Sequence, residues 1–389
     1  MSASSASFAS SKSTKAASTP IKVGEICSCS GVPGFSQFSV PSQEVVKAWA
    51  KSVNASGGIN GHPIQLIAED DGTNPGTSYS DAKTLIADHV VAIIDDTTLV
   101  DSWASLAEQA KIPVVGNYTI NTPFDTSPDF YAEGQTNSTT LQAVVDVAKF
   151  AGAKTIGNMY CAEAPVCAQS VPFVESAGKA LHVPDVFNAA ISATAPNYTA
   201  PCVAAKQAGV RALFIGDAAA VDNRVAANCA QQGFEPIYVT EGAGFDMSQA
   251  SAPAISKNLW SQYPDIPFWV NSPAVKTFNR VMDKYFPGVR TNTGLFTEDA
   301  FMDWVSGKLL QAGIQAGGLT ARGTPSASEV TKGLESLHND TLGGLAPPLS
   351  FPAGKPHPQT CFYIGRIQSG HPALANHGRP ICLKPLSSQ

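Results

Sequence analysis

The spacing of apolar residues alternates between that of strands and that of helices from residue 21 onward. Short apolar or alternating runs predict strands, and apolar residues three, four and seven positions apart predict amphipathic helices. The expected strands lie at 21–26, 64–68, 90–94 and 112–115, with helices at 45–53, 79–86 and 103–110. Strand 90–94 is apolar throughout, as in a parallel sheet covered on both faces. This pattern predicts an open α/β sheet.

The same pattern begins again after residue 138. Strands are expected at 155–160, 186–191, 210–215 and 237–240, with helices at 141–148, 173–177, 200–208 and 221–232. An aromatic, Pro-containing segment at 260–269 is typical of a crossover, and helices at 275–286, 296–312 and 328–337 and a strand at 361–367 follow it. We therefore expect lobe one at 21–138 plus 272–345, lobe two at 139–271 plus 346–389, and a disordered tether at 1–20.

Composition limits the classes of function. The 389 residues suffice for two domains, and no run of about 18 apolar residues predicts a membrane span. The net charge of −6, without any Lys/Arg run, argues against a nucleic-acid partner. Residues 2–19 are mostly Ser, Ala, Lys and Thr, and we interpret them as a tether that follows a removed signal peptide or lipid anchor. The alternative is an uninformative tail.

The eight cysteines favour disulfides and an oxidising compartment, because their number is even and their spacing is not that of a metal site. Buried free thiols in a cytosolic protein are the alternative. Two cysteines share one loop, two lie on successive helices of one unit, two remain in the tail and two form a Cys-x-Cys pair. The expected pairs are Cys161–Cys167, Cys202–Cys229, Cys361–Cys382 and Cys27–Cys29. Spacing alone does not fix this connectivity.

Several stretches together resemble the branched-chain amino-acid-binding family of type I periplasmic binding proteins. They are IKVGEICSCSG at 21–31, VNASGGINGHPIQLIAEDDGTNP at 53–75, VVAIIDDTTLVDSWASLAEQAKIPVV at 90–115, FTEDAFMDWVSGKLLQAG at 296–313 and LGGLAPPLSFPAGKP at 342–356. The resemblance implies the two-lobed type I fold, in which each lobe is a mainly parallel sheet flanked by helices and the ligand binds in the cleft between them. Two departures lie in the expected pocket: Asp95-Asp96-Thr97-Thr98 replaces a Gly-Ser segment, and Glu298-Asp299 replaces Tyr-Asp.

Ligands of open α/β sheets bind beyond the carboxyl ends of the strands, near the N-termini of helices. The hydroxyls of Thr97, Thr98 and Thr119 suit a carboxylate or an amide, although capping of the next helix explains such residues equally well. Acidic residues also gather at strand ends, which favours a ligand ammonium, and the resemblance assigns this role to Glu241. The candidate ligand-binding residues are Thr97, Thr98, Asn117, Tyr118, Thr119, Tyr160, Glu163, Asp217, Glu241 and Phe296.

No sequence feature indicates catalysis. None of the seven histidines follows an expected strand in the cleft, and no Gly-x-Ser-x-Gly, Walker or His-Glu-x-x-His motif occurs. We expect a monomeric, extracytoplasmic solute-binding protein that works with an ABC transporter permease, without cofactor, metal or nucleic acid. It would lie on the cell membrane through a lipid, or free in the periplasm or cell-wall space. Its expected ligand is an amino acid, an amide or a small aromatic or aliphatic carboxylate. A ligand-sensing receptor ectodomain with the same fold is the alternative.

Overall fold

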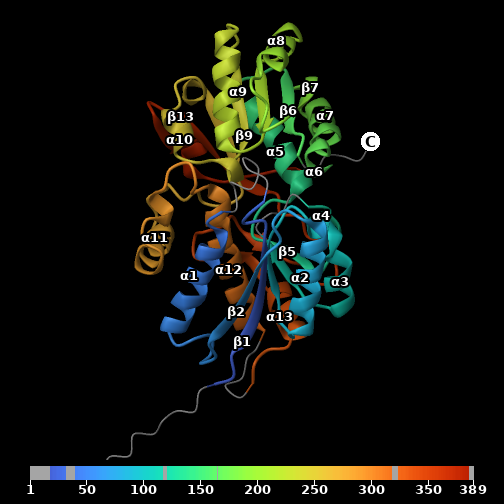
Figure 1. Cartoon of the computed structure of the whole chain (residues 1–389), viewed down its shortest axis with the longest axis vertical. Helices are drawn as coiled ribbons and strands as arrows, with labels where there is room; N and C mark the ends of the chain where they lie inside the picture. Colours follow the sequence, from blue (N-terminus) through green and yellow to red (C-terminus); the bar gives the residue numbers. More distant parts are fainter. Residues whose placement is uncertain (1–17, 32–39, 117–120, 164, 318–322, 385–389) are drawn as a thin grey trace, which may run out of the picture.

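The computed structural model describes residues 18–31, 40–116, 121–163, 165–317 and 323–384, and Figure 1 shows them as two α/β lobes stacked along the long axis. The first sheet is parallel and has the order β2-β1-β3-β4-β5. Its strands are β1 (Ile21–Cys27), β2 (Ile64–Asp70), β3 (Ile93–Asp96), β4 (Val114–Gly116) and β5 (Phe130–Ala132). The strands β1 to β4 confirm the expected α/β pattern.

Helices cover both faces of this first sheet. One face carries α1 (Ser42–Ala55), α11 (Pro273–Tyr285) and α12 (Glu298–Ala316), and α13 (Ala327–Glu335) packs on α12. The other face carries α2 (Pro75–Ala87) and α3 (Ala104–Ala110). The late helices α11 and α12 contact α1, so the chain returns to the first lobe after completing most of the second.

The second sheet has the order β14-β13-β10-β9-β8-β6-β7. Its strands are β6 (Ile156–Cys161), β7 (Asp185–Ile191), β8 (Ala212–Gly216), β9 (Ile237–Glu241), β10 (Leu259–Tyr263), β13 (Cys361–Gln368) and β14 (His371–Leu374), and β15 (Ile381–Cys382) pairs with β13. Its helices are α5 (Asn137–Phe150), α6 (Pro165–Ala168), α7 (Ser170–Leu181), α8 (Thr199–Gln207), α9 (Ala219–Gln231) and α10 (Ser248–Ser251). Strands β6 to β10 are parallel, whereas β13 runs antiparallel to β10.

Three segments join the two sheets: the turn between β5 and α5, the stretch after β10, and the stretch before β13. The first and third pair at Gln135 and Gln359, and the Ile266 N–H donates to the Leu345 carbonyl at 2.8 Å, which ties the second to the third. The short strand β12 (Leu349–Ser350) pairs with β11 (His338–Asp340), so the chain enters the second sheet later than the expected residue 346.

All eight cysteines form disulfides, in the four pairs expected from the sequence. The bond between Cys202 and Cys229 links α8 to α9 inside the core, where both side chains are fully buried. The bond between Cys161 and Cys167 joins the end of β6 to α6. These cross-links support the interpretation that the protein matures in an oxidising compartment.

Candidate functional site

A cavity of about 80 Å³ lies beyond the carboxyl ends of three adjacent strands of the second sheet. Tyr160 ends β6, Asp217 follows β8 and Glu241 ends β9, so the parallel register brings all three side chains to the same edge. Asp299 and Met302, in the first two turns of α12, close the cavity from the first lobe. The cavity is therefore enclosed by residues of both lobes.

Carboxyl groups dominate the polar lining. Asp217 is 7% exposed; its Oδ1 accepts a 2.8 Å bond from the Ala218 N–H, and its Oδ2 is buried without a hydrogen-bond partner. Burial raises the pKa of Asp217 to about 7, against the lowering effect of that bond. Burial likewise raises the pKa of Glu241 to about 7. Both groups therefore bind a proton more strongly than an exposed carboxyl does.

Further carboxyls lie behind this lining in the first lobe. Asp96, at the end of β3, and Asp299 and Asp303, on α12, are fully buried. Burial raises the pKa of Asp96 well above its usual value, and the carboxyls of Asp303 and Asp299 raise it further. The first-lobe side of the cleft therefore contains several buried carboxyl groups.

Two glutamines connect the cavity to the segments between the lobes. The Gln262 amide donates to Gln135 Oε1 at 2.8 Å and accepts from the Gly242 N–H at 3.3 Å. Gln262 is the second-last residue of β10, and Gln135 lies in the turn between β5 and α5, where the chain leaves the first lobe. Both residues line the cavity and are almost fully buried, so a solute there lies beside two of the segments that join the lobes.

The rest of the wall is largely apolar. Tyr160, Phe214 and Met302 contribute their side chains, and Cys161 and Cys167 contribute a disulfide. A small cavity with an apolar wall and a few convergent polar groups is the usual form of a ligand site. The cross-link holds α6 against β6, which fixes one side of the cavity without a polar contact.

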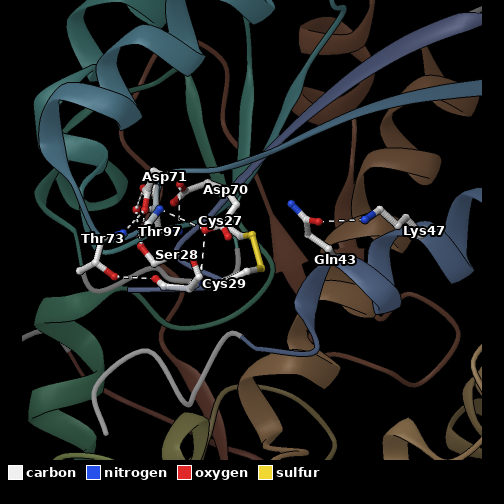
Figure 2. Close-up of a disulfide and its surroundings, with 12 residues drawn as sticks. Cys27, Ser28, Cys29, Gln43, Lys47, Asp70, Asp71, Thr73 and Thr97 are labelled. Atoms are coloured by element: carbon white, nitrogen blue, oxygen red, sulfur yellow. Dashed lines mark hydrogen bonds between the residues drawn. A yellow bond between two sulfur atoms is a disulfide. The ribbon is translucent and has the colours of Figure 1, made fainter. Parts of the chain in front are cut away.

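The loop after β1 is held by a hydrogen-bond network that uses Thr97 (Figure 2). Thr97 Oγ1 donates to Asp71 Oδ2 at 2.5 Å, and Ser28 donates to Asp71 Oδ1 at 3.0 Å. The adjacent Cys27–Cys29 disulfide braces the same loop (Figure 2). The hydroxyl of Thr97 therefore has structural partners, since it also accepts a 3.1 Å bond from the Leu99 N–H, just before the short 3-10 helix Val100–Ser102.

The remaining candidates divide into three groups. The Thr98 hydroxyl is shielded from solvent and has no hydrogen-bond partner in the described parts of the chain. Glu163 accepts bonds from Ser192 Oγ and the Ala193 N–H, both at 2.8 Å, so it holds the loop after β7. Phe296 is 2% exposed and packs on Phe268 and Phe278 outside this cavity. Asn117, Tyr118 and Thr119 lie outside the described residues.

The sequence analysis did not predict the two glutamines or the disulfide wall. Gln262 lies in a segment that we interpreted as a crossover, because its Trp, Ser, Gln and Tyr residues show no apolar alternation. The only feature of the sequence that could have indicated Gln262 as a site residue was its position two residues before Pro264, where the chain leaves this segment toward the next helices.

Comparison with known families identifies the chain. Residues 20–372 match the model of the periplasmic binding protein family. The chain belongs to this family. Its members are substrate-binding proteins that act outside the cytoplasm, and the branched-chain amino-acid-binding proteins with the same fold confirm the resemblance seen in the sequence. No curated protein sequence matches the chain.

Solved structures share the fold at low sequence identity. A branched-chain amino-acid ABC transporter protein from Thermus thermophilus, with bound valine, has a TM-score of 0.83 and 12% identity over 94% of this chain and 97% of its own. A solute-binding protein from R. palustris in complex with benzoate has a TM-score of 0.75 and 14% identity, over 95% and 99%. A fatty-acid ABC transporter substrate-binding protein from Thermomonospora curvata has a TM-score of 0.72 and 15% identity, over 93% and 92%.

Two searches of the described residues gave negative results. No helix there is both long and apolar enough to span a membrane. No group of three His, Cys, Asp or Glu side chains there has the arrangement of a metal site.

Proposed function

We propose that this protein is the extracytoplasmic substrate-binding component of an ABC importer and captures a small polar solute by closure of its two lobes. One observation carries the proposal: Asp217 and Glu241 of the second sheet and Asp299 of α12 line one cavity. Only a solute that touches both lobes shifts an equilibrium between open and closed forms, since it must bind the two forms differently.

The candidate ligands are amino acids, amides and small aromatic or aliphatic carboxylates. The relatives of the same fold are described with valine, benzoate or a fatty acid, so the fold itself does not select one of these classes. In this proposal Glu241 and Tyr160 bind the solute from lobe two and Thr98 binds it from lobe one, while Thr119, the other lobe-one candidate, lies outside the described residues. The protein would act as a monomer and deliver its solute to a membrane permease.

A thermal-shift screen of these three classes, together with simple amines, tests the proposal. A ligand at about 100 times its dissociation constant stabilises the folded state by roughly 2.7 kcal/mol. Calorimetry on Glu241→Gln then locates the site, with Glu163→Gln as the matched control, because Glu163 holds a loop rather than lining the cavity. The Glu241 variant should bind an aminated hit several-fold more weakly, and the control should not. A screen without any hit, or equal effects of both variants, would contradict the proposal.

A further inference from the structure

The charge of the cavity lining is one-sided. Three carboxyls line it, from Asp217, Glu241 and Asp299, and its described lining contains no Lys, Arg or His. Arg224 is the basic residue whose charge acts on Asp217, but its guanidinium donates to the Ala195 carbonyl at 3.1 Å and to the Tyr198 hydroxyl at 2.8 Å. An anionic solute would therefore meet carboxyls that ionise above about pH 7 at Asp217 and Glu241, and no neutralising side chain in this lining.

Asp217 provides a second, independent indication of a missing partner. Asp217 lines the cavity and is only 7% exposed, and its Oδ2 is shielded from solvent and accepts no hydrogen bond from the described residues. A buried carboxylate oxygen without a donor is unfavourable, and a donor carried by a ligand removes that cost. Glu241 ends the neighbouring strand at the same cavity, so one positively charged group is within the shared reach of two carboxyls.

Acidic residues stand at two places in the described part of lobe one that favour an anion. The N-terminus of α12 favours negative charge, but Glu298 and Asp299 of the chain itself fill its first turn. Asp95 and Asp96 end β3, and the Thr97 hydroxyl beyond them is bound to Asp71. The first-lobe wall in the described residues thus carries carboxyls and no basic side chain, and burial raises the pKa of Asp95, Asp96 and Glu298 well above its usual value.

Tyr160 and Phe214 add two aromatic rings to this lining. Aromatic faces attract cations, and the attraction increases where water is excluded. The apolar parts of Met302 and the disulfide leave room for a short hydrocarbon group beside the rings. The volume of about 80 Å³ is near half of the ~150 Å³ cavity that accepts benzene, which limits this group to a few carbon atoms.

We propose that the solute is a small organic cation, whose ammonium or guanidinium group lies between Asp217, Glu241 and Asp299 and whose short apolar part packs on Tyr160 and Phe214. This inference rests on the proposed function and changes its ligand class. It replaces the amino acids, amides and carboxylates considered above with an amine that carries no carboxylate.

Four probes of one shape separate these classes: isobutylamine as cation, isobutyramide as neutral amide, isobutyrate as anion, and valine as zwitterion. In calorimetry at pH 8 the amine should bind at least 10-fold more tightly than each of the other three. Tighter binding of valine, the amide or isobutyrate would overturn the inference while leaving the solute-binding function intact. Binding of none of the four at millimolar concentration would also overturn it, and the broad thermal-shift screen decides the function separately.

Two variants test the residues themselves. Asp217→Asn and Glu241→Gln should each weaken isobutylamine at least 10-fold and leave any weak binding of isobutyramide unchanged. Glu163→Gln is the control, because this carboxyl acts on Asp217 through space but lies outside the lining. Circular dichroism confirms that each variant is folded, and two variants keep the test decisive if one of them is not. Unchanged amine affinity in both folded variants would remove the carboxyls from the site.

The pH dependence of binding gives a third readout. Glu163 and Arg224 act on Asp217, Asp222 and Tyr198 are affected by its charge, and Asp299 lines the same cavity as both carboxyls. Because burial raises the pKa of Asp217 and Glu241 to about 7, a cation that binds their ionised forms must displace protons at lower pH. The affinity for isobutylamine should rise several-fold from pH 6 to pH 8, with proton release measurable in buffers of different ionisation enthalpy. An affinity that falls over this range would overturn the inference.

Discussion

Glu25 offers the sharpest test of how buried carboxyls affect the stability of this protein. It lies in the middle of β1 and shares a sheet face with Ile21 and Val23, because side chains alternate along a strand. Its side chain is fully buried, and neither carboxyl oxygen has a hydrogen-bond partner. Burial raises the pKa of Glu25 to about 8, although the positive charge of Lys47 opposes this effect. The folded protein thus holds a proton that the unfolded chain releases near its ordinary pKa of 4.5.

The sign and size of the effect follow from proton linkage. A group whose pKa is raised on folding stabilises the folded state fully below its unfolded pKa and loses that contribution as pH rises through the folded pKa. Between pH 5 and pH 8 the folded state binds one more proton at Glu25 than the unfolded state does. The free energy of unfolding should therefore fall by about 3 to 4 kcal/mol from this residue alone.

Urea denaturation of the wild type and of Glu25→Gln at pH 5, 6, 7 and 8 measures this contribution. Glutamine keeps the shape and stays neutral, so the two proteins should have similar stability at pH 5, and the variant should be the more stable at pH 8. Glu175→Gln, which changes an exposed carboxyl on α7, is the matched control and should follow the wild type. Parallel pH profiles for the wild type and Glu25→Gln would show that Glu25 is ionised in the fold, which refutes the reasoning.

Two further changes probe the core. Replacing Cys202 and Cys229 together with alanine should lower the free energy of unfolding by about 3 to 4 kcal/mol, because their bond closes a loop across 27 residues; an unchanged urea midpoint would contradict this. Gly307→Ala should cost about 1 to 2 kcal/mol, since the added Cβ would lie 2.7 Å from the Trp49 ring where α12 crosses α1; a variant with wild-type stability would show that this contact relaxes freely.

Much of the fold could be predicted from the sequence, because buried apolar residues recur at regular intervals along most strands and helices. The strands β1 to β4 and β6 to β9 all lie where apolar runs predicted them, within a few residues at each end. The strand β5 has only three residues, too few to show a period, and β10 buries Ser261 and Gln262 with its apolar residues, so both were missed. Elements with polar interiors or few residues leave no periodic signal.

The candidate site was harder to predict, because the type of a residue does not reveal which other residue its side chain contacts in the folded protein. Tyr160, Asp217 and Glu241 were found from their positions at strand ends, which the topology brings to one edge. Thr97 has the same kind of position, yet its hydroxyl is bound to Asp71, a residue 26 positions earlier that only the tertiary structure brings near. Likewise, no local pattern predicts that Asp299 of a late helix closes a cavity built by the second lobe.

The most direct test of the account is a crystal structure of the protein grown with saturating isobutylamine. The account requires the amine in the cavity beyond β6, β8 and β9, with its nitrogen within hydrogen-bond distance of Asp217 or Glu241 from one lobe and of Asp299 from the other. Density for the amine elsewhere on the protein, or contacts to one lobe alone, would contradict both the cavity as the binding site and closure of the lobes around a solute.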